Sequence, residues 1–187
     1  MARFPSRLVT ERLILRPPVP EDAAGVLAAV TASYRELHRW MPWAKGPYGI
    51  EQARAFCADS QEQLNKGVNF TTLLTLRDSG TIIGSSGLMG ADPALPSFET
   101  GYWAHAAYTG KGYVTEAVIA LTRLAFEGCG AKRVELKIDE NNRRSRAVAE
   151  RLGFELEATL KASGRDNAGA ITSTRIYAMF DLASLRG

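Results

Sequence analysis

Polar and apolar residues alternate along several short segments of the chain, and a period of two predicts β-strands. Residues 7–17 predict one strand, in which Arg12, Ile14 and Arg16 alternate with Leu13 and Leu15 until two prolines end the pattern. Residues 69–76 and 81–88 are β-rich and flank a turn at residues 77–80, which predicts a hairpin. The same reasoning predicts further strands over residues 97–104, 132–139, 154–162 and 173–182.

Apolar residues at helical spacing predict about four helices between these strands. Residues 20–34 form the first, with Glu21 and Asp22 in the first turn, where the helix dipole favours acids. The periodicity fails over residues 38–49, which two prolines and two glycines interrupt. The other expected helices are residues 51–66, the segment after Gly112, and residues 143–152, which Gly153 ends as a C-terminal cap.

This order of elements predicts one domain over residues 1–187, of the α/β (α+β) class. We expect a mixed, mostly antiparallel, twisted sheet of about seven strands. No Pro-, Gly- or Ser-rich linker and no internal repeat divides the chain. Strands and helices alternate towards the C-terminus, which predicts a βαβα unit there.

Composition and charge exclude several classes of protein. Apolar residues make up 45% and charged residues 23%, which is typical of a soluble globular domain. The net charge of +3 is mild, and no run of Lys and Arg indicates a nucleic-acid-binding arm. Cys57 and Cys129 show no disulfide framework and no zinc-binding spacing, so we expect no metal. Neither a signal-peptide core nor a membrane-length apolar run is found, so a cytoplasmic protein without membrane or direct nucleic-acid partners is expected.

The Gly-rich stretch YTGKGYVTEA, residues 108–117, precedes a predicted helix and is a candidate phosphate-binding loop. It is not a P-loop, because Gly112 rather than Ser or Thr follows Lys111. It is a weak dinucleotide fingerprint, because Thr115 stands where a third glycine is needed. Unpaired N–H groups at a helix N-terminus still favour a pyrophosphate, and Lys111 adds positive charge. A plain strand-to-helix turn is the alternative.

Four separated stretches, in order and spacing, resemble the GNAT superfamily of acetyl-CoA-dependent N-acetyltransferases. They are TERLILRP (residues 10–17), FETGYW (98–103), GKGYVTEA (110–117) and NRRSRAVAERLGF (142–154). Within that superfamily they look most like the ribosomal-protein alanine acetyltransferases called RimJ/RimL. HRWMPWA, residues 38–44, is similar to the Trp-rich segment after the first helix in that group.

The resemblance implies a site for acetyl-CoA built mainly from backbone. Residues 97–104 should splay from residues 134–138, so that the pantetheine arm inserts between the central strands. Thr109 and Val114 depart from the family pattern, which puts the affinity for CoA in doubt more than the function. The backbone of Tyr102, Trp103 and Ala104 would bond pantetheine and polarise the thioester, and the loop Thr109, Gly110, Lys111, Gly112, Tyr113, Val114 and Thr115 would bind the pyrophosphate.

Glu99 is the candidate general base, because alternation places it on the same strand face as Gly101 and Trp103 near the expected splay. A carboxylate in a strand-edge salt bridge is the alternative. The family's Asn-x-x-Ser pattern matches Asn142 and Ser145, which implies that Ser145 protonates or positions the thiol and that Asn142 bonds pantetheine. A helix N-cap and a first-turn residue are the corresponding structural interpretations.

Other family members use a tyrosine as the acid, at the position that Ala149 occupies here, so that mechanism does not transfer. His105 could assist proton transfer but ranks below Glu99. Glu116 is interpreted as structural, and Cys57 and Cys129 as packed thiols.

Trp40 and Trp43 lie in the irregular stretch where the family builds its acceptor wall, although buried packing of these rings is an alternative. The resemblance implies acetyl transfer to a primary amine, first of all the N-terminal α-amine of a ribosomal or other protein. A small-molecule amine such as a polyamine or an antibiotic is the alternative acceptor. A catalytically silent acyl-CoA-binding regulatory domain is the alternative outside enzymes. The resemblance also allows a homodimer.

Overall fold

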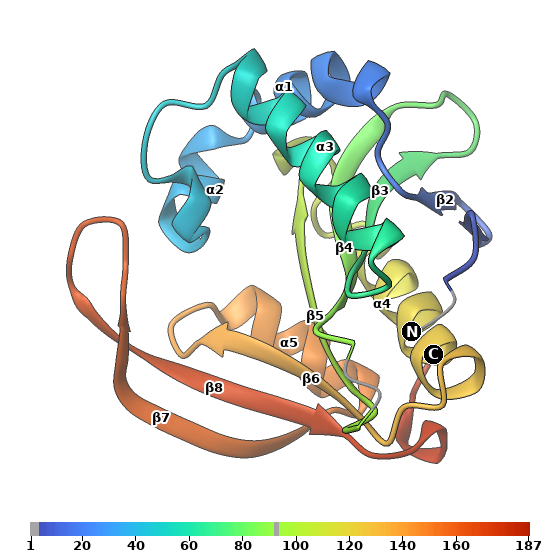
Figure 1. Cartoon of the computed structure of the whole chain (residues 1–187). Helices are drawn as coiled ribbons and strands as arrows, with labels where there is room; N and C mark the ends of the chain where they lie inside the picture. The colour runs from blue at the N-terminus through green and yellow to red at the C-terminus, as the bar shows by residue number, and fades with distance from the viewer. Residues whose placement is uncertain (1–3, 92–93) are drawn as a thin grey trace.

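An eight-stranded sheet forms the centre of the computed structural model, which describes residues 4–91 and 94–187 (Figure 1). The strands lie side by side in the order β1-β2-β3-β4-β5-β6-β8-β7. Every neighbouring pair is antiparallel except β5 and β6, which are parallel and joined through a helical crossover. The strands are β1 (Leu8–Val9), β2 (Leu13–Arg16), β3 (Phe70–Leu76), β4 (Ile82–Met89), β5 (Ser97–Ala104), β6 (Arg133–Asp139), β7 (Glu155–Arg165) and β8 (Ile171–Met179).

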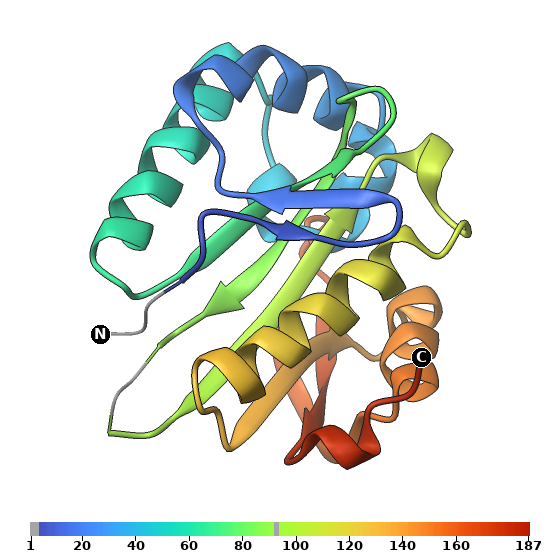
Figure 2. The same ribbon diagram turned by 90° about the vertical axis from the view of Figure 1, so that its right-hand side faces the viewer.

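Within the described residues, five α-helices cover the two faces of this sheet (Figures 1 and 2). α1 (Ala23–Thr31), α2 (Tyr34–Trp40) and α3 (Ile50–Asn65) share one hydrophobic cluster with Leu73 and Trp103. α4 (Tyr113–Arg123) and α5 (Arg143–Leu152) pack in a second cluster, with side chains such as Leu74 and Leu136. Neighbouring strand residues point to opposite faces, so Leu73 and Leu74 belong to different clusters, as the alternation predicts.

The predicted order of elements is confirmed, with one strand and one helix more than expected. Residues 7–17 form a hairpin, β1 and β2, where one strand was predicted. The Thr10 backbone N–H donates to the Leu13 carbonyl at 2.9 Å, and the Leu13 N–H donates to the Thr10 hydroxyl at 3.0 Å, which closes the turn. β1 is only two residues long, so the alternation of residues 12–16 alone does not reveal the turn.

The predicted helix over residues 20–34 is found as a 3-10 turn, Pro20–Asp22, followed by α1, and the helix breaks at Ser33 before α2 begins at Tyr34. The Ser33 backbone is non-helical (φ −124°, ψ 9°), and its buried hydroxyl accepts a hydrogen bond from the Ala106 N–H at 2.8 Å. This contact with a distant loop explains the break. The stretch predicted to be irregular contains the end of α2 and a 3-10 turn, Pro42–Ala44. Gly153 (φ 89°) ends α5, as predicted.

The central strands β5 and β6 diverge after three paired positions (Figure 1). Their register includes Ser97↔Arg133, Phe98↔Val134 and Glu99↔Glu135 and ends there. Each strand continues beyond this point while paired to its outer neighbour, as far as Ala104 on β5 and Asp139 on β6. The inner strand edges therefore face each other without a shared ladder, and the predicted splay is confirmed.

Candidate active site

A cleft of about 930 Å³ occupies the splay between β5 and β6 and extends beyond it. Its walls come from both strands, from α2 and the segment after it, from the N-terminus of α5 and from the β7–β8 hairpin. Most of the candidate catalytic and acceptor-binding residues therefore meet in one place. Among the lining residues are Trp40, Trp43, Glu99, Gly101, Tyr102, Trp103, Lys137, Asn142, Ser145 and Asn167.

The point where the strands separate carries an unpartnered polar group. Thr100 lines the cleft, its residue is 1% exposed, and its hydroxyl has no hydrogen-bond partner among the described residues. A buried hydroxyl without a partner is unfavourable unless a ligand bonds it. The inner strand edges also offer backbone N–H and C=O groups beside it. An extended chain that carries amide groups, as pantetheine does, fits this arrangement.

The Gly-rich loop adopts a conformation that only glycine takes readily, with φ of 73° at Gly110 and 84° at Gly112. In the described part of the chain, no hydrogen bond is donated by the backbone N–H groups of Gly110, Lys111 and Gly112. The first N–H groups of α4 follow directly and have no partner within the helix. The Thr109 N–H is instead used locally, at 3.3 Å from the Ala106 carbonyl. The loop therefore presents a row of donors that suits an anion.

Glu99 lies at the last paired position of β5 and borders the cleft. Its carboxylate accepts a hydrogen bond from the Lys137 ammonium at 2.7 Å, and the Glu99 side chain is 36% exposed. Lys137 also pairs with Glu135 at 3.1 Å. The hydrogen bond to Glu99, with a further contribution from Glu135, raises the pKa of Lys137 above its ordinary value. Glu99 thus forms the salt bridge that was the alternative to a role as general base. Its position also borders the cleft.

Asn142 and Ser145 form the first turn of α5. The Asn142 side chain accepts a hydrogen bond from the Ser145 backbone N–H at 3.2 Å, so Asn142 is the N-cap of the helix. The side chains of both residues border the cleft, and the Ser145 hydroxyl makes no hydrogen bond within the described part of the chain. Capping and contact with a cofactor are therefore compatible.

The Tyr102 side chain also contributes to the cleft, although the resemblance implied a role for the backbone of this residue alone. It packs partly in the core, yet it lines the cleft, and its hydroxyl donates to the Ser145 carbonyl at 3.4 Å. Burial raises the pKa of Tyr102 to about 12, so the phenol stays protonated near neutral pH. No sequence pattern distinguishes this ring from the neighbouring Trp103, which is 8% exposed in the opposite cluster.

Aromatic rings form the wall of the cleft on the α1–α3 side of the sheet. Trp43 is 44% exposed, and its ring centre lies 5.6 Å from that of Tyr48 and 6.1 Å from that of Trp103. Trp40 ends α2, with the Arg39 guanidinium 4.6 Å from its ring centre. Both candidate acceptor residues therefore line the cleft, and Trp43 presents its ring rather than burying it.

The tip of the β7–β8 hairpin reaches α2 and adds a wall that was not predicted (Figure 1). The Asn167 side-chain amide donates to the His38 carbonyl at 2.6 Å and to the Met41 carbonyl at 2.9 Å. Asp166 stabilises the turn by accepting from the Ala168 and Ala170 N–H groups, each at 2.9 Å. The turn-forming residues in GRDNAGA, residues 164–170, signal a tight connection but not its distant contact.

The model of a protein family described as "Acetyltransferase (GNAT) domain" matches residues 12–155. This region includes the Gly-rich loop, the splayed strands and the Asn142/Ser145 turn. The chain belongs to the GNAT acetyltransferase family. It is an acyltransferase that uses acetyl-CoA as the acetyl donor. The resemblance seen in the sequence is thereby confirmed.

The name of the relative YdaF and the fold of RimL support the RimJ/RimL-like group. This GNAT chain is 29% identical over 146 residues to YdaF of Bacillus subtilis (strain 168), which is named a "putative ribosomal N-acetyltransferase". The match covers 78% of this chain and 79% of YdaF. The microcin C7 self-immunity acetyltransferase MccE, solved with acetyl-CoA and AMP, has a TM-score of 0.87 at 24% identity, covering 96% and 99% of the chains. RimL, the ribosomal L7/L12 α-N-protein acetyltransferase solved with coenzyme A, has a TM-score of 0.85 at 22% identity, covering 92% and 96%.

Some titratable side chains of this GNAT domain lie outside the cleft. The His105 ring accepts from the Ala107 N–H at 3.1 Å and packs on Tyr108, and it does not line the cleft. Cys57 and Cys129 are free thiols, and burial raises the pKa of both. Within residues 4–91 and 94–187, no group of three or more His, Cys, Asp or Glu side chains could hold a metal ion. None of the described helices is long and apolar enough to cross a membrane.

Proposed function

We propose that this GNAT acetyltransferase transfers the acetyl group to the N-terminal α-amine of a protein, with a ribosomal protein as the first candidate. The observation that carries the proposal is a cleft that joins the inner edges of β5 and β6 to an exposed aromatic wall at Trp43. An amine at the end of a chain could reach Glu99 through this cleft. The name of the Bacillus subtilis relative YdaF favours a ribosomal acceptor.

The proposed reaction is direct attack of a neutral amine on the thioester that acetyl-CoA supplies. Glu99 accepts the proton that the ammonium must lose, and its place at the start of the splay puts it beside the acceptor cleft. The inner backbone edge of residues 102–104 polarises the carbonyl oxygen. As the new C–N bond forms and the C–S bond breaks, the attacking nitrogen loses a proton and the leaving thiolate gains one through the Ser145 hydroxyl, which takes up a proton in turn and ends neutral. Asn142 caps α5 and bonds the pantetheine arm.

A small-molecule amine is the second candidate acceptor, and one observation favours it. Asn167 fastens the β7–β8 hairpin to α2 through two hydrogen bonds, which narrows the acceptor side of the cleft. The structural neighbour MccE was solved with AMP as well as acetyl-CoA.

A silent acyl-CoA-binding domain would share the loop but would need neither Glu99 nor Ser145.

A panel of acceptors tests the proposal. We expect thiol release from acetyl-CoA with peptides that begin with a free α-amine, including the N-terminal sequences of ribosomal proteins. The matched control is the same peptides with a blocked N-terminus and a free lysine, for which we expect a kcat/KM at least about tenfold lower, because an ε-amine remains more fully protonated than an α-amine near neutral pH. Preference for polyamines or antibiotics would establish the second candidate. Tight CoA binding without turnover on any amine would contradict catalysis.

A further inference from the structure

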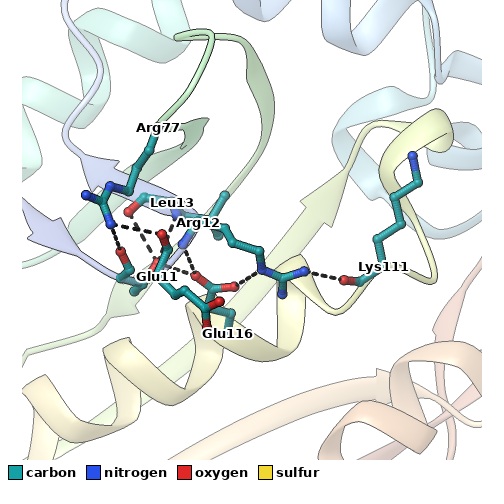
Figure 3. Close-up of polar contacts among 7 residues, drawn as sticks. Glu11, Arg12, Leu13, Arg77, Lys111 and Glu116 are labelled. Carbon is teal, nitrogen blue, oxygen red and sulfur yellow. Dashed lines mark hydrogen bonds and ion pairs between the residues drawn. The ribbon is translucent and has the colours of Figure 1, made fainter.

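Arg12, in the turn that joins β1 to β2, contacts the Gly-rich loop from behind (Figure 3). Its Nε donates to Glu116 Oε2 at 2.7 Å, and its Nη1 donates to the Lys111 carbonyl at 2.9 Å. One planar guanidinium thus bridges the first turns of α4 and the loop before it. Such a fork suits two acceptors held at a fixed separation.

The same turn also binds the second oxygen of the Glu116 carboxylate. The Arg12 backbone N–H donates to Glu116 Oε1 at 2.8 Å, and the Thr10 hydroxyl donates to the same oxygen. Although burial alone would raise the pKa of Glu116, the hydrogen bonds from Thr10 and Arg12 lower it below its ordinary value. The carboxylate is therefore charged and fully engaged by the turn. This agrees with the structural role expected of Glu116.

The turn is itself fastened to the sheet. Arg77, which follows β3, donates through Nη1 to the Thr10 carbonyl and to the Glu11 carbonyl, each at 2.9 Å (Figure 3). The Arg77 N–H also donates to the Arg12 carbonyl at 3.0 Å. The turn that holds the Gly-rich loop, residues 10–12, is therefore itself fastened to the end of the β2–β3 ladder, and this attachment holds the turn in place.

The contact with the Lys111 carbonyl fixes the direction of the next N–H group. Lys111 and Gly112 share a trans peptide, in which the C=O and N–H bonds point in opposite directions. Because the carbonyl points to Arg12, the Gly112 N–H points away from Arg12, towards the open side of the loop. A Cβ at Gly112 would lie 3.2 Å from Arg12 Nη2, so a side chain there would press on the guanidinium, and the φ of 84° itself favours glycine. The Arg12 guanidinium also lies 4.5 Å from the ring centre of Tyr113.

We propose that Arg12, held by Glu116, is a positioning residue for the pyrophosphate of acetyl-CoA, since it orients the backbone donors of the loop. The inference rests on the assignment of the pyrophosphate to this loop. Arg12 does not act as a free countercharge, because Glu116 neutralises it. The geometry of the fork, rather than the positive charge, is what the loop requires.

Titration calorimetry with CoA tests this positioning role. We expect Arg12→Ala to weaken CoA binding by about tenfold or more, as does the loss of a charge-assisted hydrogen bond. Arg12→Lys should lose nearly as much, because one ammonium cannot serve Glu116 and Lys111 together. Turnover of S-acetylpantetheine, which lacks the pyrophosphate, should stay at the wild-type value. The matched control is Arg16→Ala, which breaks a comparable pair with Asp22 (2.6 and 2.7 Å) away from the loop.

The outcomes separate the positioning role of Arg12 from the donor assignment, which is the binding of CoA with its pyrophosphate at the Gly-rich loop. Arg16→Ala should lower the melting temperature and leave CoA affinity unchanged. CoA binding of Arg12→Ala or Arg12→Lys at wild-type strength would overturn the positioning role while the donor assignment stands. An equal loss of S-acetylpantetheine turnover in Arg12→Ala would also overturn it, since the damage would then be general. Failure of the wild-type protein to bind CoA would overturn the donor assignment itself, and the positioning role with it.

Discussion

Glu99→Gln is expected to lower kcat by about a hundredfold or more at neutral pH, which is the usual contribution of a general base. Glutamine preserves the shape of the side chain. It can still accept the hydrogen bond that Lys137 donates to the Glu99 carboxylate at 2.7 Å in the wild-type protein. The negative charge that pairs with Lys137 is lost, and with it the capacity to take a proton. The rate of the variant should rise steeply with pH, because a larger fraction of the acceptor amine is then neutral without help.

Glu135→Gln is the matched control for this variant. Glu135 faces Glu99 in the β5–β6 register and shares Lys137 with it, yet it does not line the cleft. Its replacement should leave kcat within a few-fold of the wild type, since an ion pair near the surface contributes little. A wild-type kcat in Glu99→Gln, or an equal loss in both variants, would show that the Glu99 carboxylate is only part of the ion-pair network.

Gly101→Leu is expected to lower kcat/KM for the acceptor by about 10- to 100-fold, the range that steric overpacking produces. Gly101 lies on the same strand face as Glu99 and Trp103 and lines the cleft. A Cβ there would touch only the Met89 methyl group, at 3.4 Å, so the strand tolerates a side chain that projects into the cleft. The measurement is acceptor kinetics at saturating acetyl-CoA.

The affinity of Gly101→Leu for CoA should change little, because the added side chain leaves the strand on the face of Glu99 and Trp103, whereas the pantetheine arm is proposed to bond the inner backbone edge. Gly46→Leu is the matched control: it adds the same side chain where no atom lies within 4 Å of the new Cβ and outside the cleft. Normal acceptor kinetics in Gly101→Leu would place the acceptor elsewhere. A large loss of CoA binding would indicate that the added side chain blocks the donor instead.

The strands and helices could be predicted because their patterns are local. Leu13 and Leu15 on β2, and Val134, Leu136 and Ile138 on β6, are buried at alternate positions, as a period of two requires. The splay could not be predicted in this way. Nothing in the sequence of β5 indicates where its ladder with β6 ends, because that point depends on a partner strand. The expectation of a splay came from the family resemblance alone.

The unpredicted features depend on contacts between distant residues. Arg12 and Glu116 are 104 positions apart, and Asn167 and His38 are 129 positions apart. Side chains of this kind are usually solvated, so local sequence gives no reason to pair them. The same holds for Ser33, which interrupts the first predicted helix because it bonds the Ala106 N–H. Many residues that support the site lie in loops and turns, and the fold determines which distant residues they contact.

Hydrogen–deuterium exchange with and without CoA tests most directly whether the donor lies between the splayed strands. Binding there predicts slower exchange of the inward-facing amides of residues 100–104 and of the loop amides of residues 110–115. Residues 73–75 of β3 are paired with both β2 and β4, and the exchange of their amides should not change. Unchanged exchange across residues 100–104, with CoA bound and protection elsewhere, would contradict the account.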